Sequence, residues 1–143
     1  MTVAIVNVCF DPRLNHEVIR SQVVTRLQAQ QQPVDRVFIT NEAAGNVGTG
    51  LRNAIDLLSR SGEAIAMVAV LDHDDCVAAA AGMRQALSDR LGAVTEYVIG
   101  KGIRCQVAGG TVLTENNVVR WDGWPPANTG SGQFTMPSIF GPL

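Results

Sequence analysis

The sequence predicts an α/β fold in which a mostly parallel sheet of four to five strands is flanked by helices. Short apolar runs rich in Val and Ile alternate with longer stretches of helical periodicity, in the order strand, helix, strand, helix, strand, helix. Successive parallel strands need a crossover between them, and a helix supplies it through a right-handed connection. This alternation therefore indicates parallel strands covered by helices.

The first half of the chain is expected to form two strands, each followed by a helix. Residues 2–8 are mostly β-branched and uncharged, as in a buried strand. Asn15 is the expected N-cap of a helix over 16–30. Residues 36–40 read as the second strand, and the apolar spacing over 51–58 predicts an amphipathic helix.

The second half is expected to hold the most apolar strand, a helix and a hairpin. Residues 64–71 form the third strand, and the Ala-rich stretch 76–91 is expected to be one helix closed by Gly92. The stretch 94–99 fits either a helix or a strand. Three short strands are expected to complete the sheet: 104–108, 111–114 and 118–121. The last two of them are expected to form a hairpin.

Length and composition indicate one domain with a substantial core. The chain has 143 residues, of which 46% are hydrophobic, and this composition argues against disorder. We expect a single α/β domain over residues 1–121. Residues 122–143 change to Gly, Pro and Ser with scattered apolar side chains. We expect this loop-rich tail to dock on its own domain or on a partner subunit.

Charge and cysteine content narrow the partners. A net charge of −2 offers no basic surface for nucleic acid, and no apolar run is long enough for a membrane helix. Three cysteines, an odd number far apart in the chain, fit metal or thiol chemistry in a reducing compartment better than a disulfide framework. The N-terminus lacks the pattern of a signal peptide, so we expect a cytoplasmic protein.

Two short clusters carry the chemistry. Cys9 follows the first strand, and His73 and Cys76 follow the third. Two thiols and one imidazole are a zinc ligand set that leaves a fourth position open, as in catalytic rather than structural zinc sites. Because ligands bind beyond the carboxyl ends of parallel strands, the three side chains can converge if the first and third strands are neighbours.

An acidic and a basic residue accompany the first cysteine. Asp11 and Arg13 alternate with Cys9 along the chain. Arginine can hold a carboxylate in a bidentate pair, which would keep Asp11 ionised and fixed beside the metal. Asp11 could then accept a hydrogen bond from a zinc-bound hydroxide.

Together the clusters resemble the zinc site of the β-class carbonic anhydrases. The resemblance rests on Cys9-x-Asp11-x-Arg13 combined with His73-x-x-Cys76. Other segments are similar to that family's second strand and the Arg-Asn-Ala-Gly segment after it, to the next helix and to a late strand: residues 35–45, 51–55 and 107–112. The resemblance covers residues 3–121.

The resemblance implies a β-carbonic-anhydrase-like fold and a zinc enzyme. Cys9, His73 and Cys76 would be the Zn²⁺ ligands, and Asp11 and Arg13 the catalytic pair that orients the metal-bound hydroxide. The implied reaction is the reversible hydration of CO2 to bicarbonate, with no cofactor beyond zinc. In some members the residue corresponding to Asp11 occupies the fourth zinc position and switches the site off. We expect a homodimer or a dimer of dimers.

Three positions depart from the family pattern and keep other functions open. Val77 stands where the family usually has Gly, Thr40 stands where it has Arg, and Glu42 looks inserted. One alternative is hydrolysis of carbonyl sulfide or carbon disulfide on the same scaffold. Another is a zinc-binding module that serves binding or assembly and has lost turnover. Metal-free thiol chemistry is disfavoured because neither Cys9 nor Cys76 belongs to a Cys-x-x-Cys pair.

The remaining polar residues near the clusters are expected to have structural roles. Asp74 and Asp75 are expected to cap the following helix, and Asp72 to be a solvated loop residue. We expect His16 at the surface, at the start of a helix, with a proton-shuttle role as the alternative. Cys105 lies in a strand-like run and is expected in the core.

Overall fold

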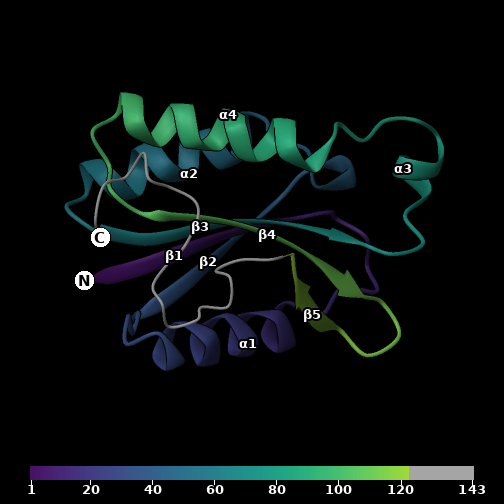
Figure 1. Ribbon diagram of the computed structural model, residues 1–143, viewed down its shortest axis with the longest axis horizontal. Helices are drawn as coiled ribbons and strands as arrows, with labels where there is room; N and C mark the ends of the chain where they lie inside the picture. Colours follow the sequence, from purple (N-terminus) through teal and green to yellow (C-terminus); the bar gives the residue numbers. More distant parts are fainter. Residues whose placement is uncertain (123–143) are drawn as a thin grey trace.

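The computed structural model describes residues 1–122 and shows a five-stranded sheet in the order β2-β1-β3-β4-β5 (Figure 1). The first four strands in this order are parallel, and β5 runs antiparallel to β4. The predicted α/β class and the mostly parallel sheet are therefore confirmed. The strands are β1 (Thr2–Val8), β2 (Arg36–Asn41), β3 (Ala64–His73), β4 (Gln106–Leu113) and β5 (Val118–Trp121).

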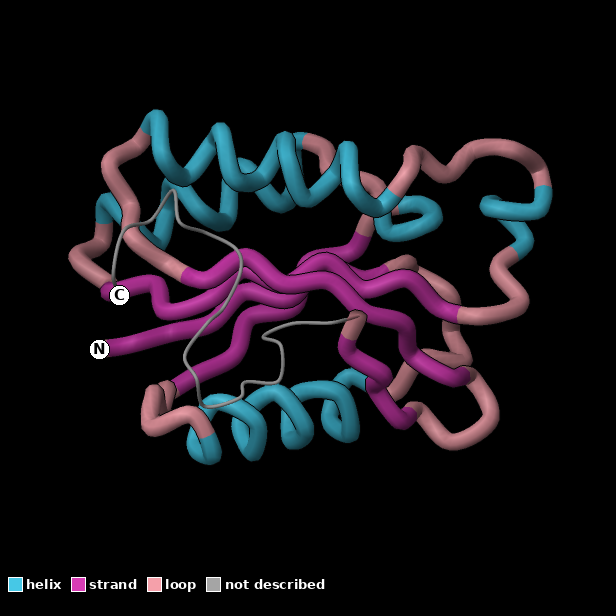
Figure 2. Tube along the Cα trace, viewed as in Figure 1, coloured by secondary structure: helices cyan, strands magenta, loops and turns pink. Residues whose placement is uncertain are grey.

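Helices cover both faces of the sheet, which makes three layers (Figures 1 and 2). Helices α2 (Thr49–Arg60) and α4 (Leu87–Gly100) lie on one face, and α1 (His16–Ala29) lies on the other. A hydrophobic core lies on each face of the sheet, and the side chains of β1 alternate between the two. Val3 and Ile5 face α2 and α4, whereas Val6 and Val8 face α1. Burial on both faces explains why the central strands read as continuous apolar runs.

Helix α1 begins where the sequence predicts. Oδ1 of Asn15 accepts hydrogen bonds from the backbone N–H groups of Glu17 at 3.0 Å and Val18 at 3.1 Å. These are two of the donors that a helix start leaves without intrahelical partners. The N-cap prediction is therefore confirmed.

The predicted single helix over 76–91 is wrong. The structure has a short helix α3 (Val77–Ala80), a connection, and then α4, which takes in the ambiguous stretch 94–99. Gly82 breaks the helix with a φ of 80°, a left-handed conformation that favours glycine. The side chain of Asn46 then fixes the connection: its Nδ2 donates to the Met83 carbonyl at 2.7 Å, and its Oδ1 accepts from the Gln85 N–H at 3.0 Å.

The strand predictions at the end of the described chain are confirmed in outline. The two pieces expected at 104–108 and 111–114 form one continuous strand, β4, and β4 and β5 form the predicted hairpin. Gly110 permits β5 to approach β4 closely, because an added Cβ would lie 2.6 Å from the Arg120 carbonyl oxygen of β5. Within residues 1–122, no helix is both long and apolar enough to cross a bilayer. The predicted docking of the tail concerns residues outside this described range, apart from Asp122.

Candidate metal centre

The two sequence clusters meet at the carboxyl edge of the sheet. Cys9 follows the last residue of β1, and His73 is the last residue of β3. Strands β1 and β3 are direct neighbours, with Asn7 opposite Val70, so the condition for convergence is fulfilled. Chain connections leave this pair of strands in opposite directions along the sheet, which is where open α/β sheets bind ligands.

Cys9, His73 and Cys76 form a group of three potential metal ligands. Their ligand atoms all lie within 4.8 Å of one another, and all three side chains are buried. Cys76 reaches the group because the turn over 74–75 brings the chain back after β3. Thiolate sulfur and imidazole nitrogen are the donors that Zn²⁺ prefers. The chemistry of the donor set therefore fits a zinc ion.

The ring of His73 is oriented so that one nitrogen faces the group. Nδ1 lies 2.7 Å from the backbone carbonyl of Asp74, and since a carbonyl only accepts, Nδ1 carries the proton. Nε2 is left with its lone pair, and this buried atom has no hydrogen-bond partner. A buried acceptor without a partner is costly, and a metal ion would satisfy it.

Asp11 and Arg13 form the predicted bidentate pair. Nε of Arg13 donates to Oδ1 of Asp11 at 3.1 Å, and Nη2 donates to Oδ2 at 2.8 Å. The Arg13 backbone N–H also donates to Oδ1 at 2.8 Å. Chiefly through the side-chain hydrogen bonds from Arg13, the pKa of Asp11 falls from its ordinary value near 3.8 to about 2. Asp11 is therefore a carboxylate throughout the neutral range.

The carboxylate of Asp11 lies beside the ligand group. Its Oδ2 is 3.8 Å from Nε2 of His73, too far for a hydrogen bond but within reach of a small molecule bound between them. The structure thus brings together all five residues predicted for the site: three potential ligands and the Asp–Arg pair. Their catalytic and metal-binding roles stay predictions.

The expected roles of three acidic residues in the His73–Cys76 turn region were wrong. The N-cap of α3 is Cys76, and no side chain caps that helix. Asp74 instead accepts the backbone N–H of Thr114 at 2.7 Å and so ties the turn to the β4–β5 hairpin. Asp75 accepts from Arg13, as described below.

Asp72 is not a solvated loop residue. It belongs to β3, and its carboxylate pairs with the buried guanidinium of Arg90 at 2.7 and 3.1 Å. Arg90 also donates to the Gly45 carbonyl at 3.1 Å and to the Gln85 carbonyl at 3.0 Å. The pair thus holds α4 and the segment after β2 against the carboxyl edge. Sequence reasoning missed it because the partners lie on different elements and no local pattern links them.

Thr40 takes part in a second network in the same region. Its hydroxyl donates to Oδ1 of buried Asn7 at 2.6 Å, and Nδ2 of Asn7 donates to the carbonyls of Gly45 at 3.2 Å and Asn46 at 3.1 Å. Thr40 therefore supports the loop after β2. Val77, the other departure from the family pattern, is 79% exposed.

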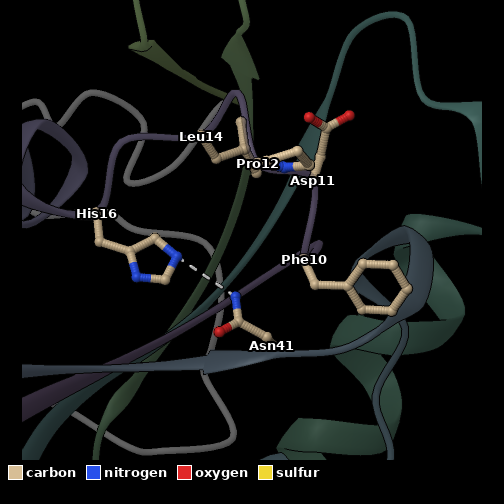
Figure 3. A pocket seen from close by; sticks show the side chains of 6 residues that line it. All are labelled: Phe10, Asp11, Pro12, Leu14, His16 and Asn41. Carbon is tan, nitrogen blue, oxygen red and sulfur yellow. Dashed lines mark hydrogen bonds between the residues drawn. The ribbon is translucent and has the colours of Figure 1, made fainter.

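A pocket of about 250 Å³ lies beside the candidate centre and is lined by Phe10, Asp11, Pro12, Leu14, His16 and Asn41. Figure 3 shows the Asp11 carboxylate pointing away from the side chains of Phe10 and His16, which line the pocket. His16 is half-buried at the first position of α1, and Nε2 of its ring lies 3.4 Å from Nδ2 of Asn41. The expected helix-start position of His16 is confirmed.

Comparisons with known proteins give structural likeness only. No protein-family model matches the chain, and no curated protein matches it. A carbonic anhydrase from Streptococcus mutans is similar in structure, with 20% identity, a TM-score of 0.45, and coverage of 83% of this chain and 80% of that one. A carbonic anhydrase from Glaciozyma antarctica is similar with 18% identity, a TM-score of 0.43, and the same coverages of 83% and 80%.

Proposed function

We propose that this protein is a zinc hydro-lyase that catalyses the reversible hydration of CO2 to bicarbonate. The observation that carries the proposal is the group of Cys9, His73 and Cys76, with an unpartnered Nε2 turned into it and an ionised Asp11 beside it. This combination would supply a metal site and an oriented acceptor at one place on the sheet edge.

The donor set suits the charge of zinc. Two thiolates and one neutral imidazole would balance the charge of Zn²⁺, and three protein ligands leave the fourth position for a small molecule. When bound, zinc would lower the pKa of a water molecule in that position to about 7.

Asp11 and Arg13 would orient the attacking water. Oδ2 of Asp11 faces the ligand group and, as a carboxylate oxygen, can only accept a hydrogen bond. A water that donates one hydrogen to this oxygen has its lone pair directed away from Asp11, toward an incoming CO2. The bidentate bond from Arg13 fixes the carboxylate plane, so that this direction is set before CO2 arrives.

The oligomeric state is part of the proposal. Large apolar side chains are exposed directly after two of the candidate ligands, at Phe10 and Val77. Exposed apolar surface beside a functional site favours association with a partner. We propose a homodimer or a dimer of dimers, which light scattering on the purified protein measures directly.

The test is metal quantification followed by stopped-flow CO2 hydration from about pH 6.5 to 9. We expect about one zinc per chain and a zinc-dependent rate that rises with pH. Asp11→Ala should retain zinc and lose about 100-fold in kcat/KM, because the acceptor that orients the water is gone. Glu96→Gln, an exposed change on α4 that also removes one negative charge, should leave the rate unchanged.

Two outcomes would contradict the proposal. Full zinc occupancy with no CO2 hydration at any pH would point to another substrate or to a module without turnover. Full activity in Asp11→Ala would remove the orienting role given to the carboxylate.

A further inference from the structure

Arg13 joins the Asp11 carboxylate to the turn that carries His73 and Cys76. Besides its two bonds to Asp11, Nη1 of Arg13 donates to Oδ2 of Asp75 at 3.0 Å, and Nη2 donates to the Asp75 backbone carbonyl at 2.8 Å. These contacts use four of the five N–H groups of the guanidinium. Its rigid plane therefore couples Asp11 and Asp75 in one geometry.

Asp75 has a backbone conformation that its side chain has to tolerate. Its φ is 53°, in the left-handed region that few residues other than glycine and asparagine or aspartate adopt readily. The residue sits between the two candidate ligands of the turn, and its side chain is 80% exposed. A turn alone would be satisfied by glycine, so the bond from Arg13 is what the aspartate side chain adds.

Asp11 has two possible partners, Arg13 and the metal. A carboxylate oxygen is itself a zinc ligand. Oδ2 of Asp11 lies 3.8 Å from Nε2 of His73, so a small shift of the carboxylate would bring it into the metal's fourth position. Arg13, whose side chain is 43% exposed, opposes this shift only while its guanidinium stays in place.

We propose that Asp75 is a positioning residue that holds Arg13 in place and thereby keeps Asp11 out of the metal's fourth position. The inference rests on the proposed metal centre but not on the identity of the substrate. Removing the Asp75 carboxylate takes away the partner of Nη1 of Arg13. Arg13 then holds Asp11 less firmly, and the Asp11 carboxylate more often occupies the fourth position.

The test uses Co²⁺-substituted protein and azide as a probe of the fourth position. The optical spectrum of the bound Co²⁺ reports its ligands, and azide competes with Asp11 for the open position. Asp75→Gly removes the carboxylate and suits the left-handed backbone, whereas Asp75→Asn keeps an oxygen that can accept from Nη1. Glu96→Gln is the control for charge.

We expect azide to bind Asp75→Gly about fivefold more weakly than the wild-type protein, a factor that corresponds to an exposed ion pair. The optical spectrum of Co²⁺ bound to Asp75→Gly should shift in the direction expected for a carboxylate ligand. Asp75→Asn should restore most of the affinity, and Glu96→Gln should match the wild type. In an Asp11→Ala background, Asp75→Gly should have no effect on azide, because the competing carboxylate is absent.

The outcomes separate this inference from the proposed function. Equal azide affinity and spectra in Asp75→Gly and the wild type would overturn the inference even if CO2 hydration were rapid. So would an effect of the same size in the Asp11→Ala background, since it would not pass through Asp11. If the wild-type protein does not hydrate CO2 but Asp75→Gly still weakens azide binding, the proposed function alone is overturned. Failure of the protein to take up Co²⁺ would overturn both.

Discussion

The Asp11–Arg13 pair is the ion pair whose carboxylate lies beside the candidate centre. Arg13 supplies three hydrogen bonds to one carboxylate, two from its guanidinium and one from its backbone. A carboxylate held in this way keeps its charge far into the acid range. The pair thus acts on the stability of the protein as well as on the orientation of the site.

The depressed pKa of Asp11 predicts a specific loss of stability in acid. Because the pKa of Asp11 is about 2 in the folded state and lies near 3.8 ordinarily, its ionised form stabilises the fold above about pH 4. This contribution is lost as the pH falls through the folded-state pKa. Urea unfolding of the metal-free protein should therefore show a steeper decline between about pH 4 and 2 in the wild type than in Asp11→Asn. Parallel declines in the two proteins would contradict it.

At the scale of elements, the carboxyl edge of the sheet is held by polar contacts between segments far apart in the chain. Arg90 of α4, Asp72 of β3 and the Gly45 carbonyl after β2 meet in one buried network. Such networks are strong only when every member has its partner. The network also reaches the candidate centre, because Arg84, which lies 3.5 Å from Oδ1 of Asp72, donates to the His73 carbonyl at 3.2 Å.

Removing Asp72 should therefore be costly. Asp72→Ala leaves the buried guanidinium of Arg90 without its counter-charge, and we expect a loss of about 3 kcal/mol in the free energy of unfolding. Chemical denaturation measures it. Glu96→Ala, an exposed substitution on the same helix as Arg90, should change the free energy by less than about 0.5 kcal/mol. A similar small change in Asp72→Ala would show that Arg90 reaches solvent.

The sequence predicts those helices and strands that are determined by contacts between residues close together in the chain. The strand positions could be predicted from local apolar runs. The start of α1 could be predicted from Asn15, because its side chain bonds to backbone N–H groups only two and three residues further along the chain. The helix over 76–91 was predicted wrongly because Gly82 adopts a left-handed conformation that a tertiary contact from Asn46 supports. Local propensity does not contain that contact.

The same reasoning applies to the candidate site. The candidate ligands and the Asp–Arg pair could be predicted to lie together because each lies in a short motif at a strand end. The bond between Arg13 and Asp75 could not be predicted, because it joins residues 62 apart in the sequence and depends on the pairing of β1 with β3. The pairing of Asp72 with Arg90 was hidden for the same reason.

At the scale of the whole molecule, the candidate centre links the two central strands of the sheet. Cys9 comes from the end of β1, and His73 and Cys76 come from the end of β3 and the turn after it. A metal bound there has a high affinity only for the folded chain. Binding should therefore stabilise the entire fold.

Zinc should raise the free energy of unfolding by about 4 kcal/mol when its free concentration is a thousandfold above the dissociation constant. Denaturation with and without a chelator measures this increment. Cys9→Ser should abolish most of it. Cys105→Ala should retain it, because Cys105 is buried in the other core, where burial raises the pKa of its thiol to about 12. An increment that survives in Cys9→Ser would place the metal elsewhere.

The separation of the three candidate ligands along the chain also has a consequence for biosynthesis. During translation Cys9 emerges before His73 and Cys76, which follow only after α1, β2 and α2 have been made. Until then its thiol lacks the companions that bury it and is open to oxidants in the surroundings. The arrival of β3 beside β1 ends this period, so the order of synthesis sets how long the nascent chain carries a vulnerable cysteine.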